Sequence, residues 1–317
     1  MRLVFMGTPA FVVPVLDALV NAPGVQVAGV YAPPDRPGGR GRRADVSPIK
    51  SYALEKGLAL FQPSSLRTAE SQEELAAIAP EVIVVAAYGN LLPAQVLELP
   101  PHGCLNLHPS LLPLHRGPSP VSTAILEGDT VSGTTLMLLD RGMDTGPIIA
   151  QRQYQLSGAE TAETLTADLF QLGTSLLLEK LDDWAGGRLT AKPQEEADAT
   201  ITQKLDRADG QANWSLPAAA LERKRRAFSP WPGLFTHWQE KVLKLLDVVA
   251  LPAETAEAAR SSQQPGRVLA LGTSDVPLGI ATARGVLGLK TLQMEGRRAV
   301  AAAEFLRGYP QFVDARL

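Results

Sequence analysis

Residues 82–87 read Val-Ile-Val-Val-Ala-Ala, a run of apolar side chains that no polar residue interrupts. Such a run is typical of a strand that is buried on both faces, as the strands of a parallel sheet are. Other apolar segments and helix-like segments alternate along this part of the chain. The expected strands are 3–6, 25–31, 58–61, 105–108 and 134–139, and the expected helices are 9–19, 47–56 and 69–78. This alternation predicts an α/β fold with a doubly wound, mostly parallel sheet.

The turn after the first expected strand contains Gly7, followed by Thr8 and Pro9. Thr8 is expected as the N-cap of the next helix and Pro9 as its first residue, because these residue types favour those positions. A dinucleotide-binding turn would need two more glycines, but Pro9 and Val12 stand in their places. The turn therefore does not predict a nicotinamide or flavin cofactor.

Asn106 and His108 lie two residues apart in a segment expected to be extended, so their side chains share one face of the strand. Pro109 disfavours helical geometry at His108, which places the imidazole at the end of this strand. A carboxylate, Asp144, follows in the segment 138–146. An amide, an imidazole and a carboxylate can hold a developing oxyanion and move a proton. These three residues are candidates for catalysis of acyl or formyl transfer, or else they cap a strand and satisfy a buried loop.

The sequence offers no obvious protein nucleophile. No serine stands in a Gly-x-Ser-x-Gly context, which marks the nucleophile of many hydrolases. Cys104 precedes Asn106 by two residues on the same side of the expected strand. The nucleophile is therefore expected to come from a substrate.

Six segments resemble motifs of the 10-formyltetrahydrofolate-dependent formyltransferases. They are, in chain order, Met6–Phe11, Pro33–Arg43, His108–Pro113, Arg116–Pro120, Asp140–Gly146 and Arg226–Gly233. The first two narrow the resemblance to the branch of the family that acts on methionyl-tRNA, and the last resembles the start of its second domain. The fold expected from the resemblance is a formyltransferase-type sheet followed by that second domain.

The resemblance implies transfer of the formyl group from N10 of 10-formyltetrahydrofolate, as co-substrate, to the α-amino group of methionine esterified to initiator tRNA. It also implies roles for the three candidates. Asn106 and His108 donate hydrogen bonds to a tetrahedral oxyanion, while Asp144 holds His108 in the required protonation state and helps to take the proton released by the attacking nitrogen. Whether His108 or Asp144 finally carries that proton stays open.

The resemblance further implies a folate site in two loops that follow expected strands. The loop after residues 82–87 supplies backbone hydrogen bonds and an apolar lining to the pterin ring, and Ser110 in the other loop offers a hydroxyl near the formyl group. Read without the family, Tyr88 and Gly89 form only the turn that ends a strand. The folate-binding residues implied are Tyr88, Gly89, Leu92, Ser110, Leu111, Leu112 and Pro113.

Loss of apolar periodicity predicts a linker at 190–206 between a catalytic domain at 1–189 and a second domain at 207–317. The second domain begins with a helix-like segment at 218–227 and continues with short strand-like stretches. They are 235–238, 242–249, 267–271, 277–281 and 286–292. Short strands with regular turns predict a small β-barrel. The resemblance makes it a barrel of the oligonucleotide-binding type, closed by a helix at 300–306.

The charge of the chain is unevenly distributed. Residues 1–206 hold 15 Lys and Arg against 23 Asp and Glu, whereas residues 207–317 hold 15 against 10, and the net charge is −3. A basic C-terminal part suits a polyanion such as RNA. The arginines between residues 36 and 43 lie among Pro and Gly and can engage phosphates of the tRNA acceptor arm. The candidate tRNA-binding residues are Arg36, Arg40, Arg42, Arg43, Lys224, Arg225 and Arg226, of which the last three also fit a solvated helix face.

A length of 317 residues accommodates two domains with substantial cores. One cysteine excludes an internal disulfide, and no Cys/His cluster of the kind that binds zinc occurs, so no metal is expected. The sequence shows no signal peptide and no apolar run of about 18 residues. We expect a cytoplasmic, monomeric protein that does not enter a membrane.

Three alternatives share part of this pattern. A formyltransferase for a small amine, such as an amino sugar or a purine nucleotide, would use the same Asn106, His108 and Asp144 but is expected to lack the arginine-rich segment 36–43. A formyltetrahydrofolate hydrolase would use water as the acceptor and usually belongs to a longer chain. A catalytically silent RNA-binding protein would keep the basic surfaces and would not require the three candidates.

Overall fold

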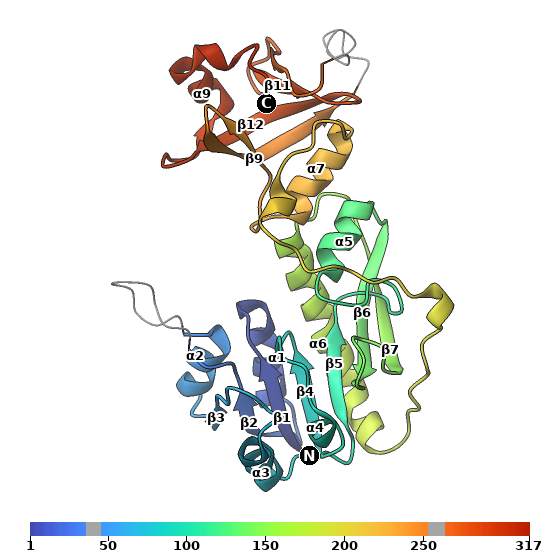
Figure 1. Ribbon diagram of the computed structural model, residues 1–317. Coiled ribbons are helices and arrows are strands. Elements are labelled where there is room, and N and C mark those ends of the chain that lie inside the picture. The colour runs from blue at the N-terminus through green and yellow to red at the C-terminus, as the bar shows by residue number, and fades with distance from the viewer. Residues whose placement is uncertain (36–45, 253–263) are drawn as a thin grey trace. The chain divides into compact units, whose positions relative to one another are not determined.

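A computed structural model describes residues 1–35, 46–252 and 264–317 (Figure 1). Four of the arginines assigned to tRNA binding, Arg36, Arg40, Arg42 and Arg43, lie outside the described residues. The chain divides into two compact units. The first comprises Met1–Pro120, Val131–Gln155 and Leu165–Gln203, and the second comprises Val121–Thr130, Leu156–Thr164 and Lys204–Leu317.

The described strands of the first unit form one sheet in the order β3-β2-β1-β4-β5-β6-β7. They are β1 Arg2–Gly7, β2 Gln26–Tyr31, β3 Leu60–Phe61, β4 Val82–Ala86, β5 Cys104–His108, β6 Val131–Leu138 and β7 Ile148–Gln155. The pairs from β3 to β5 are parallel, whereas β6 is antiparallel to both β5 and β7. The predicted mostly parallel sheet is confirmed. Strand β7 has no counterpart among the expected strands, because its residues are largely polar and alternate between half-buried and exposed.

The described helices up to residue 203 are η1 Ala10–Val12, α1 Val13–Val20, α2 Pro48–Glu55, α3 Ala69–Ile78, α4 Ala94–Leu97, α5 Pro120–Glu127, α6 Ala162–Ala185 and η2 Glu196–Asp198. Most of α5 and the first turn of α6 belong to the second unit. The prediction that Thr8 caps the first helix is wrong. Pro9 takes the N-cap position of η1, and the hydroxyl of Thr8 donates to the carbonyl oxygen of Tyr88 at 3.0 Å. In the part of the chain that the structure describes, no helix is both long and apolar enough to span a membrane.

The sheet of the first unit separates two apolar cores. Leu3 and Phe5 of β1 belong to one core, and Val4 and Met6 belong to the other, as the period of two along a strand requires. All four side chains are fully buried. This explains why the central strands read as continuous apolar runs.

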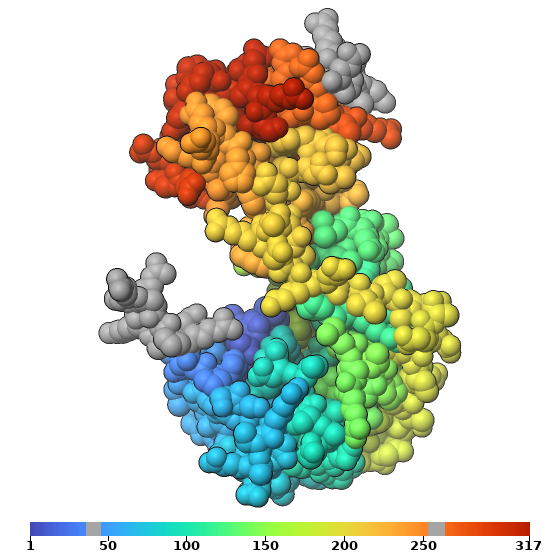
Figure 2. All heavy atoms as spheres, viewed as in Figure 1, coloured from blue at the N-terminus to red at the C-terminus, as the bar shows by residue number. Residues whose placement is uncertain are grey.

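The segment after α6 remains with the first unit. In Figures 1 and 2 its yellow chain runs over the surface of that unit beside the green strands. Ile148 and Lys192 exchange two backbone hydrogen bonds of 2.8 Å, and the amide of Arg116 donates to the carbonyl oxygen of Thr200 at 2.9 Å. Hydrogen bonds therefore hold much of the segment expected as a linker.

The second unit contains an antiparallel sheet in the order β10-β11-β12-β9-β8, with β13 paired to β12. Its elements are η3 Ala208–Gly210, α7 Ala218–Ala227, β8 Phe235–Trp238, β9 Lys241–Leu251, β10 Val268–Ala270, β11 Leu278–Ala281, β12 Val286–Met294, β13 Val300–Ala301, α9 Ala302–Gly308 and η4 Pro310–Phe312. Leu221 of α7 and Phe305 of α9 share one core with the sheet. The last helix begins later than expected, because Val300 and Ala301 pair with β12.

Leu105 is fully buried in β5, the strand that carries Asn106 and His108. Leu105→Ala leaves a cavity in this core and is expected to lower the free energy of unfolding by about 2–5 kcal/mol. The matched control is Val131→Ala on β6, where the side chain is 37% exposed, and its loss is expected to be much smaller. Urea unfolding measures both variants, and equal losses would contradict the burial described for β5.

Candidate active site

Strand β5 presents the first two candidate residues at its carboxyl end. Asn106 pairs with Val85 of β4 and Met137 of β6, and His108 pairs with Thr135 of β6. Asn106 is half-buried and His108 is buried. The period of two places both on the same face of the sheet, and ligands of open α/β sheets bind at the carboxyl ends of the strands.

The imidazole of His108 is only 4% exposed, and each of its nitrogens faces an oxygen atom of another residue. Its Nε2 lies 3.0 Å from the carbonyl oxygen of His115. Since a carbonyl oxygen can only accept, Nε2 carries the proton of the neutral ring and Nδ1 presents its lone pair. Nδ1 lies 3.6 Å from Oδ2 of Asp144. The carbonyl thus fixes the tautomer and turns the basic nitrogen toward a carboxylate.

Burial lowers the pKa of His108 below its usual value, and this is the largest effect on the ring. The Asp144 carboxylate and the hydrogen bond to His115 oppose the shift by raising the pKa. Because burial dominates, the imidazole is neutral near pH 7 and Nδ1 is available to accept a proton.

Asp144 lies in the connection between β6 and β7 with a φ of +56°. This left-handed conformation is disfavoured for residues other than glycine, although Asp and Asn tolerate it better than most. Several hydrogen bonds hold it in place. Oδ2 accepts from the amide of Gly117 at 2.8 Å, and Nε2 of Gln194 donates to the carbonyl oxygens of Asp144 and Gly146 at 2.8 and 2.7 Å. The structure therefore places Asp144 in direct contact with His108. Asn106 lies near His108 because both belong to strand β5.

The loop after β5 is held by side chains of β6 and β7. Thr135 Oγ1 donates to the carbonyl oxygen of Ser110 at 2.7 Å and accepts from the amide of Leu112 at 3.1 Å. Gln151 Nε2 donates to the carbonyl oxygen of Leu112 at 2.7 Å. The hydroxyl of Ser110 is buried and donates to the carbonyl oxygen of Leu114 at 2.6 Å. The antiparallel strands thus fix the backbone of this loop.

Tyr88, in the loop after β4, is 4% exposed. Burial raises the pKa of the Tyr88 hydroxyl. Gly89 has a φ of +84°, which glycine adopts without strain. Of the other implied folate residues, Leu92, Leu111 and Pro113 are half-buried, and Leu112 is buried. Both loops follow the carboxyl ends of the neighbouring strands β4 and β5.

The basic residues at the end of α7 belong to the second unit. Nζ of Lys224 donates to the carbonyl oxygen of Gln211 at 2.8 Å, and burial lowers the pKa of Lys224. Arg226 is 8% exposed and pairs with Glu222 at 2.8 Å. Arg225 is half-buried. Lys224 and Arg226 therefore bind groups within their own unit.

Sequence reasoning missed the residues that hold the candidate pair, above all Arg116, Gly117 and Gln194. Arg116 and Gly117 stand in the motif Arg116–Pro120, which carries the resemblance without revealing what they contact. Gln194 lies 50 positions from Asp144 in the segment expected as a linker. No local pattern marks it, because its partners come from a distant part of the chain.

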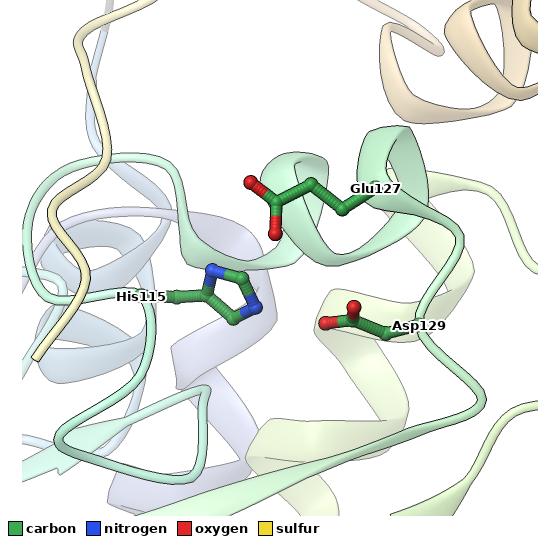
Figure 3. A group of neighbouring side chains, drawn as sticks. All are labelled: His115, Glu127 and Asp129. Atoms are coloured by element: carbon green, nitrogen blue, oxygen red, sulfur yellow. The ribbon is translucent and has the colours of Figure 1, made fainter. Parts of the chain in front are cut away.

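Figure 3 shows the side chains of His115, Glu127 and Asp129, which are of the types that bind metal ions. His115 belongs to the first unit, whereas Glu127 and Asp129 belong to the second. We therefore assign no metal site to this group.

The lowered pKa of His108 predicts a pH dependence of stability. In the unfolded chain His108 titrates near its usual pKa of about 6.5, so below that pH the unfolded state binds a proton that the folded state resists. The contribution of His108 to the free energy of unfolding is therefore constant above this pH, and it decreases as the pH falls below it. Between about pH 6.5 and 5, the free energy of unfolding of the unaltered protein is expected to decrease more steeply than that of His108→Gln, by up to about 1.4 kcal/mol per pH unit. Urea unfolding across this range measures the difference, and parallel curves would contradict a neutral buried His108.

Two family models match the chain. The model described as formyl transferase covers residues 1–181, and the model described as formyl transferase, C-terminal domain, covers residues 204–310. Among solved structures, HypX from Aquifex aeolicus in complex with tetrahydrofolic acid has a TM-score of 0.63 at 17% identity, over 99% of this chain and 48% of that chain. The chain thus spans about half the length of HypX. This likeness shows the fold.

The curated relatives are more similar. Methionyl-tRNA formyltransferase of Chloroflexus aggregans is 44% identical over 97% of this chain and 97% of the relative. The enzyme of the same name from Roseiflexus sp. is 45% identical over 97% of this chain and 92% of the relative. With these identities over nearly the full length, and with both formyltransferase models matched in order, the chain belongs to the methionyl-tRNA formyltransferase family.

Proposed function

We propose that this chain transfers the formyl group of 10-formyltetrahydrofolate to the α-amino group of methionyl initiator tRNA, which gives N-formylmethionyl-tRNA for translation initiation. Membership of the family supports the reaction. The observation that carries the site is the contact of 3.6 Å between Nδ1 of His108 and Oδ2 of Asp144. This contact pairs a neutral base, His108, with a carboxylate. His108 shares its strand face with Asn106, so the groups for proton transfer lie next to a donor for an oxyanion.

The acceptor amine has an ordinary pKa of about 7.7–8.0, so a useful fraction is neutral near pH 7 and needs positioning more than activation. Its attack on the formyl carbon forms the new C–N bond and leaves an oxyanion. Asn106 donates to this oxyanion, and His108 also donates to it through Nε2–H once the hydrogen bond from Nε2 to the carbonyl oxygen of His115 is broken.

The proton of the attacking nitrogen passes to the pair of His108 and Asp144. Before this step the lone pair of Nδ1 faces the Asp144 carboxylate. A proton between Nδ1 and Oδ2 makes this contact a charge-assisted hydrogen bond. Collapse of the oxyanion then breaks the bond between the formyl carbon and N10 of the folate, and N10 takes up a proton as it leaves. The pair thus stores the proton between the two halves of the reaction.

We propose that the folate binds in the two loops that follow β4 and β5, with Tyr88, Gly89 and Leu92 contributed by the first loop and Ser110–Pro113 by the second. For the tRNA we propose two basic groups, the arginines of 36–43 and the end of α7. The catalytic domain is assigned to 1–189 and the tRNA-binding domain to 207–317. The protein is proposed to act as a monomer in the cytoplasm, where translation begins.

The acceptor can be identified by a direct comparison. The protein is incubated with formyl-labelled tetrahydrofolate and, separately, with charged initiator tRNA, charged elongator tRNA, free methionine, an amino sugar nucleotide and buffer alone. We expect label on initiator methionyl-tRNA well above all other acceptors, because only that substrate offers both the amine and a polyanion to bind. Equal labelling of free methionine, or faster labelling of the sugar, would overturn the tRNA assignment, and loss of formyl to water in buffer would indicate a hydrolase.

Asp144→Asn tests the proposed catalytic carboxylate. Asn tolerates left-handed backbone and turns, so folding is expected to survive, whereas loss of the charge is expected to lower single-turnover transfer by about 10²–10⁴-fold. Asp140→Asn in the same connection, where the exposed carboxylate accepts from Gly142 and Thr145 of its own turn, is the matched control. A stable Asp144→Asn protein with normal turnover would refute the assignment.

A further inference from the structure

Residues 115–117 contact both members of the proposed catalytic pair. The carbonyl oxygen of His115 accepts from Nε2 of His108 at 3.0 Å. Two residues later, the amide of Gly117 donates to Oδ2 of Asp144 at 2.8 Å. The position of this segment therefore sets both the tautomer of His108 and the direction of the carboxylate that faces it.

Arg116, between these two residues, is tied down by the segment 194–202. Its amide donates to the carbonyl oxygen of Thr200 at 2.9 Å, and its carbonyl oxygen accepts from the amide of Thr202 at 2.8 Å. The side chain is 3% exposed, with Nη1 2.9 Å from a carboxylate oxygen of Glu196 and Nε donating to Oε1 of Gln194 at 2.9 Å. A buried guanidinium needs such partners, because removing an unpaired charge from water is costly.

Gln194 passes this constraint on to Asp144. A guanidinium only donates hydrogen bonds, so the amide oxygen of Gln194 must face Arg116 and the amide nitrogen must face away from it. That nitrogen has two protons, and two acceptors receive them: the carbonyl oxygens of Asp144 at 2.8 Å and of Gly146 at 2.7 Å. Arg116 thereby fixes the orientation in which Gln194 can hold the turn.

The turn needs holding for two reasons. Strand β6 is antiparallel to β5, so its last residue, Leu138, pairs with Leu105 at the start of β5. The chain must fold back from there for Asp144 to reach His108 at the other end of β5. Asp144 also keeps a φ of +56°, and a strained conformation of this kind persists only where its surroundings impose it.

We propose that Arg116 and Gln194 are positioning residues of the formyl transfer: together they hold the backbone of the Asp144 turn so that its carboxylate faces Nδ1 of His108. The inference rests on the proposed function, since it concerns the same pair. Both residues act through Asp144, so their effect belongs to the rate of the chemical step rather than to substrate binding.

Gln194→Asn is the first test. It removes one methylene and keeps an uncharged amide, which can no longer bridge Arg116 and the two carbonyl oxygens. We expect kcat to fall by about tenfold to a hundredfold while KM for the folate and for charged tRNA stays unchanged. The Asp144 carboxylate raises the pKa of His108. Displacement of this carboxylate is therefore expected to move the acidic limb of the plot of kcat against pH to lower pH. NMR titration of the labelled imidazole measures the same shift in the free enzyme.

Two further variants accompany it. Gln194→Glu keeps the length of the side chain and an acceptor for Arg116 but removes both N–H donors, so the same fall in kcat is expected, and it replaces Gln194→Asn if that variant does not fold. Gln153→Glu, at an exposed position of β7, makes the same chemical change away from the site and is expected to keep the kcat of the unaltered protein.

The outcomes separate this inference from the proposed function. Folded Gln194 variants with normal kcat and a normal His108 titration would overturn the inference. Lower stability alone, with kcat per folded molecule and titration unchanged, would overturn it as well, because that is the result of a merely structural role. If the unaltered protein formylates none of the acceptors, the proposed function fails, and the titration of His108 in Gln194→Asn, which adds no charge, still decides whether Gln194 holds Asp144 against His108. A lower pKa of His108 supports this and an unchanged pKa refutes it.

Discussion

A buried imidazole needs a polar partner at each ring nitrogen, because a buried polar atom without one costs free energy. At His108 a hydrogen bond meets this requirement at Nε2, whereas Nδ1 faces a carboxylate, and the candidate site follows from this difference. The Nε2 of His108 is matched by a backbone carbonyl oxygen at 3.0 Å, which leaves Nδ1 as the basic nitrogen opposite Asp144 at 3.6 Å. Burial keeps the ring neutral, the carbonyl selects its tautomer, and the carboxylate makes protonation of Nδ1 favourable during the reaction.

The antiparallel part of the sheet makes this arrangement possible. Antiparallel strands can be joined by a short connection, whereas parallel strands need a long crossover. The connection between β6 and β7 is short and delivers Asp144 to the sheet face of His108, while Thr135 and Gln151 from the same strands hold the loop after β5. The two antiparallel strands β6 and β7 therefore supply the carboxylate of Asp144 and also fix the loop after β5.

Much of the fold could be predicted from the sequence, since hydrophobic periodicity reports local structure directly. The expected helices 69–78 and 218–227 are α3 and α7, and the apolar run 82–87 is the central strand β4. The shared face of Asn106 and His108 also follows from sequence, because a period of two along a strand needs no tertiary information. Polar β7 could not be found in this way, because an edge strand of half-exposed residues has no apolar signal.

The sequence by itself determined the residue types of the candidate site, the strand that carries two of them and the family motifs around them. Only the tertiary structure decided that Asp144 faces His108, since β6 ends at the opposite end of β5 and the chain must fold back. It also decided that Gln194, 50 positions from Asp144, belongs to the site. Hydrogen bonds between distant segments depend on where folding brings their backbones, and no pattern of neighbouring residues encodes that distance.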